Sequence, residues 1–455
     1  METLVPITDD WRPAEAAVTP IERTDRPVIG ALAAILGVHV GIFLYVAAQG
    51  FVRQPYSDMF DFLRAEFDFE RGGDLIGYLA SPHNHQHLVW VRLLTALDVQ
   101  VFHGSALIFL IASSVSILIA AAVLAAGIWR GTPTRVVGAI GGLLAATLIV
   151  SAVNATDCTQ PINSVYAIAF GFAVLAISLF ERAGQDQPGR TVLFATLALT
   201  AAIGAVAGSA AGVAVFPVLI VSAARHPGAR NLVAPTLLIG ALASAIVLAA
   251  LFSDAPGQSS SSAPGHAWKM IQYFVVYAGM PWSAVRLFSH FRLAVGLATI
   301  VIGAVVLWRG SRRGGAAGRL ERVGLDLILF ALITAAMAAL GRVDENAAVV
   351  VPVRYAVFMS AFQVGVICVL APALAERWAR LKSYAGPAAL AVGVALLAQQ
   401  AAAGSSLLRT SHYIRSEIAA FQAGARRPEM RQLIHPDFNV AAQVQAECRH
   451  RGLYQ

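Results

Sequence analysis

Carboxylates gather early in the chain, just after its first apolar segment. Seven of the 26 Asp and Glu residues lie between residues 51 and 104. Asp58 and Asp61 are three residues apart, so a helix places both on one face. A carboxylate at a lipid–water boundary can act as a general base, with a pKa raised by desolvation. We predict catalytic roles for Asp58 and Asp61; the alternative is a solvated helix start capped by Ser57 or Asp58.

Histidines form a second cluster at residues 81–87, Ser-Pro-His-Asn-His-Gln-His. Its opening Ser-Pro pair is typical of a helix start and predicts an amphipathic helix over 82–102. His83 and His87 then share a face near the helix N-terminus, where free backbone N–H groups suit a phosphate. We expect His83, Asn84 and His87 to bind a phosphorylated ligand. The alternatives are a His-x-His-x-His metal site and a hydrated helix start.

Two later segments carry further candidate binding residues. Gln160 and Asn163 lie in a short polar link between apolar runs, where they can line a sugar pocket, although such links are polar in any case. Lys269 lies in the aromatic-rich stretch 268–291, which follows a flexible linker over 253–265 and predicts an interfacial helix.

Arg342 and Arg354 bracket a short polar loop, and Tyr355 directly follows the second arginine. The forked guanidinium group suits phosphate, which it binds with two parallel hydrogen bonds. We therefore expect Arg342 and Arg354 to bind an anion, with Tyr355 covering it at the membrane interface. The alternative is a pair of arginines that snorkel to the interface without a ligand.

The composition requires a membrane to position these groups. The chain is 57% hydrophobic and only 13% charged, with a mean hydropathy of +0.67, whereas soluble domains contain roughly 25% charged residues. Soluble enzymes, secreted disulfide scaffolds and disordered chains are excluded. No P-loop, dinucleotide fingerprint or CxxC motif occurs. The sequence predicts an all-α polytopic membrane protein.

About eleven apolar runs are long enough to act as transmembrane helices. The run 191–224 is too long for one span and is broken by small residues at 208–212, so we divide it into two short spans. Residues 1–27 are predicted to form a disordered cytoplasmic tail, 28–402 a transmembrane domain with 51–104 as its first outer loop, and 403–455 an outer tail. The runs are 28–50, 105–129, 136–153, 164–181, 191–224, 231–252, 291–308, 323–341, 355–373 and 384–402.

Positive charges predict the orientation. With the N-terminus inside, five short inner loops hold 14 Lys and Arg residues, whereas the much longer outer loops between spans hold 8. We therefore interpret the net charge of +7 first as a result of membrane topology, and only second as an indication of nucleic-acid binding. We expect the C-terminus and the functional face to lie outside. Cys158 and Cys448 both fall on that face, either as a disulfide or as free thiols.

Together these features resemble the membrane-embedded glycosyltransferases of the GT-C type, which carry an acidic residue and two interfacial helices in the first outer loop. The counterparts here are Asp58 and Asp61 with the stretches 59–71 and 82–102. A poorly characterised bacterial branch adds a His-Asn-Glu-His-Arg-like motif, a Gln-x-x-Asn element and a late Gly-Arg…Arg-Tyr pair. These are similar to His83-Asn84-His85-Gln86-His87, Gln160…Asn163 and Gly341-Arg342…Arg354-Tyr355. The acidic residue of the histidine motif is missing, and Leu88 stands where arginine is expected.

The resemblance implies a glycosyltransferase, transferring a hexose or pentose from a polyprenyl-phosphate donor to a glycan or lipid acceptor of the cell envelope. The reaction would occur on the outer face of a bacterial inner membrane, with membrane lipids as further partners and no nucleic acid. Asp58 would be the catalytic base or a ligand of a divalent cation (Mg²⁺, Mn²⁺ or Ca²⁺). Arg342 and Arg354 would hold the donor phosphate.

Three other functions compete with this interpretation. A transporter or flippase for lipid-linked glycans would carry charges near the bilayer midplane; Asp326 lies within a predicted span but near its inner end, which disfavours ion-coupled transport. An O-antigen polymerase or ligase usually has a large late outer loop, whereas the largest predicted loop between spans here is the first. A non-catalytic assembly protein is the third.

Overall fold

The computed structural model describes residues 21–83, 86–183, 188–225, 227–253, 265–280, 282, 290–313, 318–342 and 349–454. Over these ranges the regular structure is helical and contains no strand. Nine helices are long and apolar enough to cross a membrane, and two shorter apolar helices, Arg135–Ile149 and Ala210–Arg225, accompany them. The protein is therefore an all-α polytopic membrane protein, as the composition predicted.

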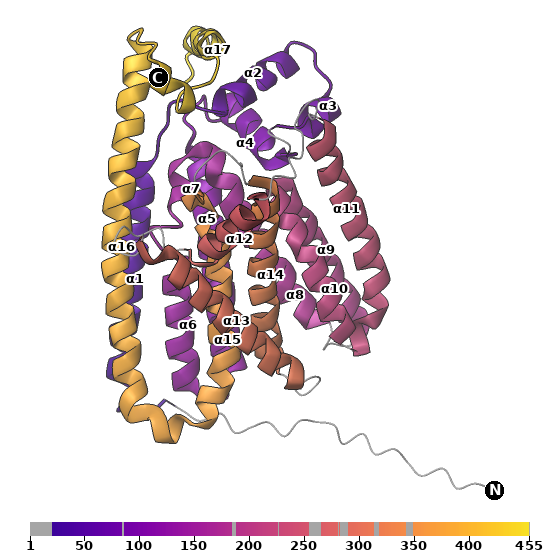
Figure 1. The fold of residues 1–455 in the computed structure, drawn as a ribbon, viewed down its shortest axis with the longest axis vertical. Helices are drawn as coiled ribbons and strands as arrows, with labels where there is room; N and C mark the ends of the chain where they lie inside the picture. The colour runs from indigo at the N-terminus through magenta and orange to yellow at the C-terminus, as the bar shows by residue number, and fades with distance from the viewer. Residues whose placement is uncertain are drawn as a thin grey trace, which may run out of the picture.

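Each of the predicted spans coincides with a helix of the bundle in Figure 1. These helices are α1 (Arg26–Gly50), α5 (Leu107–Gly131), α6 (Arg135–Ile149), α8 (Ser164–Ala183), α9 (Pro188–Gly208), α10 (Val215–Arg225), α11 (Val233–Ser253), α13 (Arg292–Arg313), α14 (Arg319–Arg342), α15 (Ala356–Glu376) and α16 (Trp378–Gln422).

The long run 191–224 is divided as predicted. The short turn η2 (Ala210–Ala214) separates α9 from α10. Gly212 makes the reversal feasible, because a Cβ atom there would lie only 2.2 Å from the carbonyl carbon of Ala205. The remaining single-turn elements are η1 (Pro161–Asn163), η3 (Pro227–Leu232), η7 (Val353–Tyr355) and η8 (Pro428–Gln432).

The last span continues far beyond its predicted end. We expected a helix over 384–402 followed by a separate tail, but α16 runs unbroken to Gln422. It ends where Gly424 adopts a φ of +100°, the left-handed conformation in which helices commonly terminate. At ~1.5 Å per residue the helix is ~68 Å long, about twice the ~30 Å hydrocarbon thickness. The first part of the predicted tail is thus a rigid extension of the bundle.

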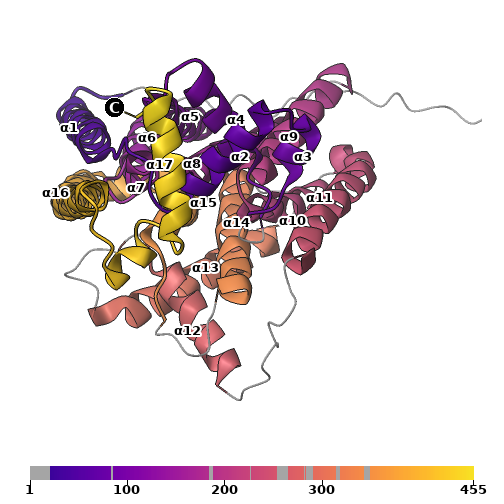
Figure 2. The ribbon, with the colours of Figure 1, turned by 90° about the horizontal axis from the view of Figure 1, so that it is seen from above.

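Hydrogen bonds fix α16 to the start of the chain. The side chain of Gln400 donates to the carbonyl oxygen of His39 in α1 (3.2 Å) and accepts from the backbone N–H of Ala152 (2.5 Å). Further along, the Arg415 guanidinium donates to the carbonyl oxygen of Phe51 (3.0 Å). Figures 1 and 2 show α1 and α16 side by side.

Six short helices complete the fold: α2 (Met59–Glu70), α3 (Leu75–Ala80), α4 (Val89–Gln100), α7 (Thr156–Thr159), α12 (His266–Ala278) and α17 (Phe438–His450). Helices α2, α4 and α17 lie at the end of the bundle where α16 terminates, opposite the end where α1 begins. Seen from above, α17 lies between α16 and α2 (Figure 2). We call this the α17 end of the molecule.

The predicted helix over 82–102 is wrong in its first part. Residues 81–83 and 86–88 are not helical, and α4 starts only at Val89. His83 and Gln86 instead exchange two backbone hydrogen bonds of 2.8 and 3.0 Å. His83 and His87 therefore do not share a helix face.

Contacts with the α9–α10 turn explain this difference. The side-chain oxygen of Gln86 lies 3.5 Å from both the Ser209 hydroxyl and the backbone nitrogen of Ala210. The indole N–H of Trp90 donates to the carbonyl oxygen of Gly204 (2.8 Å). These tertiary contacts hold the histidine segment against the bundle and override its local helix signal.

The carboxylates of Glu181 and Asp326 are buried towards the other end of the bundle, and both are paired. Glu181 lies 3.0 Å from Nε of Arg322, and Asp326 lies 3.4 Å from a guanidinium nitrogen of Arg225. Sequence reasoning weighed Asp326 and overlooked Glu181 near it. Since removing one partner of a buried ion pair costs about 3–5 kcal/mol, these pairs hold α8, α10 and α14 together.

The three cysteines Cys158, Cys368 and Cys448 are all free and buried. The alternative of a bond between Cys158 and Cys448 is therefore wrong, and three free thiols are present. Other predictions fall largely outside the described residues: the tail over 1–27, of which 1–20 are not described, the linker over 253–265, and the second half of the stretch 268–291.

The buried cysteines make a topology experiment straightforward. We expect Ser416→Cys, at an exposed position near the end of α16, to react with a membrane-impermeant maleimide in intact cells with a permeable outer envelope. Ser383→Cys, exposed at the other end of the same helix, should react only after the inner membrane is permeabilised. The reverse pattern would contradict the predicted orientation, and the unsubstituted protein gives the background.

Candidate functional site

Asp58 and Asp61 lie at the start of α2, each beside an imidazole. Asp58 occupies the N-cap position, yet its side chain makes no capping hydrogen bond. Helix capping therefore does not explain why an acidic residue stands at this position. Its Oδ2 atom lies 3.3 Å from Nε2 of His83, and Oδ1 of Asp61 lies 3.2 Å from Nε2 of His435. The two carboxylates remain 37% and 39% exposed, so both can reach a ligand.

His435 is a site residue that sequence reasoning missed. It follows η8 in the C-terminal segment, is buried, and meets the backbone oxygen of Asp437 through its second ring nitrogen (2.7 Å). The neighbouring Ile434 accepts a backbone hydrogen bond from Ser57 (2.5 Å). No motif surrounds His435, and its partner Asp61 precedes it by 374 positions, so the sequence offered no local signal.

The pKa of Asp58 lies below its ordinary value, contrary to our expectation. Burial alone would raise this pKa, but the hydrogen bond from His83 and the charges of His83 and Arg354 outweigh it. Ser57 adds a weaker hydrogen bond in the same direction. Asp58 is thus a stable carboxylate at neutral pH, suited to orienting a hydroxyl group or holding a cation.

Asp58, Asp61 and His83 form a compact set of possible metal ligands. One ligand atom from each lies within 4.8 Å of the others. Carboxylate oxygens with one imidazole suit Mn²⁺, and Mg²⁺ or Ca²⁺ when water completes the shell. The three-histidine alternative is not supported, because His83 joins the carboxylates, His87 is not in this set, and His85 lies outside the described residues.

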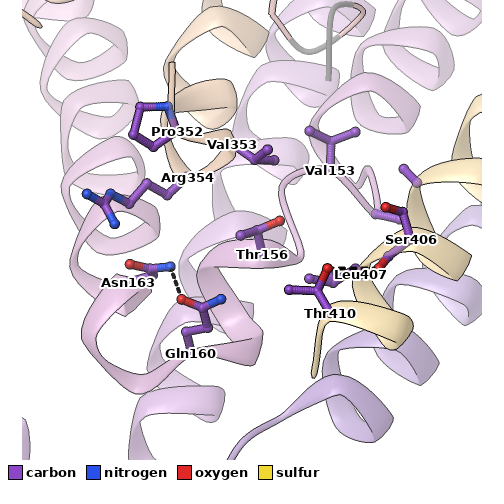
Figure 3. A pocket seen from close by; sticks show the side chains of 12 residues that line it. Val153, Thr156, Gln160, Asn163, Pro352, Val353, Arg354, Ser406, Leu407 and Thr410 are labelled. Atoms are coloured by element: carbon purple, nitrogen blue, oxygen red, sulfur yellow. Dashed lines mark hydrogen bonds between the residues drawn. The ribbon is translucent and has the colours of Figure 1, made fainter. Parts of the chain in front are cut away.

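A separate cavity of about 240 Å³ lies at the level of α7 (Figure 3). Its walls come from the α6–α7 link, η1, η7 and α16. Asn163 donates to the side-chain oxygen of Gln160 (2.8 Å), and the hydroxyl-bearing residues Ser406 and Thr410 line the α16 side. Three predicted binding residues, Gln160, Asn163 and Arg354, thus meet in one cavity. Its lining is Ala152, Val153, Thr156, Gln160, Asn163, Pro352, Val353, Arg354, Ala403, Ser406, Leu407 and Thr410.

Arg354 is held by aromatic rings. Its guanidinium carbon lies 5.7 Å from the ring centre of Tyr166 and 5.6 Å from that of Tyr355, within the range of cation–π attraction. Tyr355 is itself buried and stacks on Tyr277 at 5.6 Å. Tyr355 therefore supports the arginine from within the protein and is not at the membrane surface. Arg354 is also among the residues that line the cavity.

Asp157 is a second carboxylate near Arg354. Its side chain is 1% exposed, and neither oxygen has a hydrogen-bond partner among the described residues. Burial raises its pKa well above the ordinary value, although the charge of Arg354 acts in the opposite direction. Asp157 is thus held as a neutral acid with unused hydrogen-bonding capacity. It lies in the same polar link as the predicted binding residues Gln160 and Asn163.

The remaining predicted residues are not brought into this cavity. Lys269 lies in the first turn of α12 and does not line it. His87 is half-buried in the segment before α4. Asn84 and the side chain of Arg342 lie outside the described part of the chain.

Comparison with protein-family models, with curated proteins and with solved structures found no match to this chain. Function must therefore be argued from the site itself.

The acidic trio predicts metal binding that one titration can measure. We expect the purified protein to bind Mn²⁺, and Asp58→Asn and His83→Ala each to weaken binding at least about tenfold through loss of a ligand. Free Mn²⁺ is measured by electron paramagnetic resonance. Asp68→Asn, at an exposed acid on the same helix that pairs with Arg71, is the matched control. Equal binding by all four proteins would contradict the site.

Proposed function

We propose that this protein is a membrane glycosyltransferase that takes its sugar from a polyprenyl-phosphate donor and passes it to a glycan or lipid acceptor of the cell envelope. Two observations carry the proposal: Asp58 lies 3.3 Å from His83 at the start of α2, and Arg354 lines a cavity close enough for its charge to act on this carboxyl. Gln160 and Asn163 line the same cavity. A carboxylate and a cation in one site are what this transfer requires.

The roles of these groups follow from the reaction. The acceptor hydroxyl attacks the anomeric carbon, a new glycosidic bond forms, and the bond to the lipid phosphate breaks. Asp58 orients the hydroxyl and receives its proton. Arg354 stabilises the charge on the departing phosphate. A divalent cation at Asp58, Asp61 and His83, when bound, would supply further positive charge for the leaving group.

The surroundings of the 240 Å³ cavity lined by Arg354, which we call the Arg354 cavity, support a lipid-linked donor. A second cavity, of about 410 Å³ and almost wholly apolar, lies among α6, α15 and α16. The link that follows α6, the segment that leads into α15, and a later part of α16 form walls of the Arg354 cavity. An isoprenoid chain lying along this seam would keep its phosphate at Arg354, so the head group needs only a small polar pocket. The α17 end would then face outside, as the charge distribution predicts.

Asp58→Asn should fold normally and lose transfer activity. The amide fills the same space but cannot accept the acceptor's proton, and general-base catalysis contributes about 10²–10⁴-fold. The measurement is turnover of a radiolabelled polyprenyl-phosphate sugar by purified protein, with folding followed by size-exclusion chromatography. Asp68→Asn again serves as the control. Turnover close to that of the parent would reject Asp58 as the base.

Arg354→Ala should weaken binding of polyprenyl phosphate roughly 10–150-fold, since charge-assisted hydrogen bonds contribute about 1.5–3 kcal/mol. Arg354→Lys keeps the charge, loses the fork, and should show a smaller defect. Affinity is measured on folded protein in nanodiscs, with Arg64→Ala, exposed on α2, as the control. Unchanged affinity would move the search for the phosphate site to Lys269, Arg342 and His83.

A further inference from the structure

A third cavity, of about 520 Å³, lies at the α17 end between α2 and the C-terminal segment. Its polar lining comes from segments far apart in the sequence: Gln54 before α2, Gln422 at the end of α16, and Gln445, Arg449 and Tyr454 in or after α17. Phe60 of α2 forms part of the apolar wall. The volume falls within the ~300–1,000 Å³ typical of ligand pockets.

The lining has the chemistry that recognises sugars. The side chains of Gln54, Gln422 and Gln445 make no hydrogen bond to another residue of the described chain. A primary amide donates and accepts, and so does a sugar hydroxyl. Arg449, exposed at the rim, adds a cation, and the lining contains no carboxylate. A neutral or anionic glycan fits this surface better than a cation does.

Salt bridges and hydrogen bonds keep the walls in place. Arg451 pairs with Glu70 at the end of α2 and with Glu447 of α17. The Tyr454 hydroxyl donates to Asp98 (2.8 Å), which also accepts from the backbone of Ala106 (2.8 Å). Burial raises the pKa of Asp98 to about 6 despite these bonds. The C-terminal segment is thus fastened to both α2 and α4, and the cavity is preformed.

This third cavity and the Arg354 cavity lie at different heights along α16. Residues 403–410 of α16 line the Arg354 cavity, and Gln422 lines this one. Gln422 follows Thr410 by twelve positions, which corresponds to ~18 Å of helix. Phe60 of α2 lines this third cavity. The Asp58 carboxyl, two residues before Phe60, is acted on by the charge of Arg354, which lines the other cavity. The start of α2 therefore lies near both cavities.

We propose that this third cavity binds the glycan part of the acceptor, an inference that rests on the proposed function. The donor head group enters at Arg354 from the membrane, and the acceptor glycan enters from the α17 end. Its reacting hydroxyl then points across α2 towards Asp58. Gln54, Gln422 and Gln445 bind sugar hydroxyls, and Arg449 binds a hydroxyl or an acidic group at the rim.

The test measures glycan binding directly. Full-length protein in nanodiscs is applied to an array of defined bacterial cell-envelope oligosaccharides, and the affinity of each retained oligosaccharide is then measured in solution. We expect the parent to retain a defined subset. The double variant Gln445→Ala/Arg449→Ala should bind it at least about tenfold more weakly, since it loses a neutral and a charge-assisted hydrogen bond. Gln443→Ala, exposed on the same helix, is the matched control and should bind like the parent.

Two results would overturn the proposal: no retained oligosaccharide, or retention that the double variant leaves unchanged. Either can occur while Asp58→Asn still abolishes transfer, in which case the glycosyltransferase proposal survives and the acceptor site lies elsewhere. The converse result is glycan binding that depends on Gln445 and Arg449 together with full turnover in Asp58→Asn. It would support the glycan site and reject the catalytic assignment of Asp58. In assays of transfer, the double variant should raise the KM for acceptor and leave polyprenyl-phosphate affinity unchanged.

Discussion

The positive charge of Arg354 acts on carboxyl groups from two separate segments, the start of α2 and the short helix α7. A guanidinium removed from bulk water loses hydration that its surroundings must replace. The rings of Tyr166 and Tyr355 replace part of it, and the charge of Arg354 acts on both Asp58 and Asp157. Yet the Nε atom of Arg354 and both oxygens of Asp157 have no hydrogen-bond partner in the described ranges.

Charges towards the other end of the bundle behave differently. Glu181 and Arg322, and Asp326 and Arg225, meet at 3.0 and 3.4 Å. Ionisable groups inside a membrane domain either neutralise each other or serve a function. Within each pair the acid and the arginine compensate each other's charge, so a structural role is enough to explain their presence. Asp58 and Asp61 differ from these buried carboxylates because they remain 37% and 39% exposed. This exposure is the physical reason for placing the chemistry at the α17 end.

The long helix α16 determines how the α17 end is assembled. Gln400 ties it to α1 and to the end of α6, and Arg415 ties it to the chain that leaves α1. Its rigid extension carries the C-terminal segment to a level above the bundle, where His435 reaches Asp61. Without that extension, the loop that bears Asp58 and Asp61 would have contacts on one side only. The catalytic candidates therefore depend on residues at the opposite end of the sequence.

The sequence by itself located the apolar helices and their order, because the bilayer thickness demands apolar runs of a minimum length and every run is local. Of the eleven predicted spans, nine are long enough to cross a membrane in the described residues, and two are shorter helices. The sequence also placed Asp58 beside Asp61 and Gln160 beside Asn163, since neighbours three residues apart remain together in any helical turn. Even the break at 208–212 was visible, because small residues permit a tight reversal.

Only the tertiary structure decided the rest. Residues 81–88 were expected to begin a helix, but the hydrogen bonds of Gln86 and Trp90 to α9 and its following turn override that local preference. The pKa of Asp58 is lowered and not raised, because Arg354 and His83 approach it. His435 and Asp61 form a contact that no spacing rule can anticipate. Local propensity and hydrophobic length act over a few residues, whereas charge and hydrogen bonding depend on which distant segments the fold brings together.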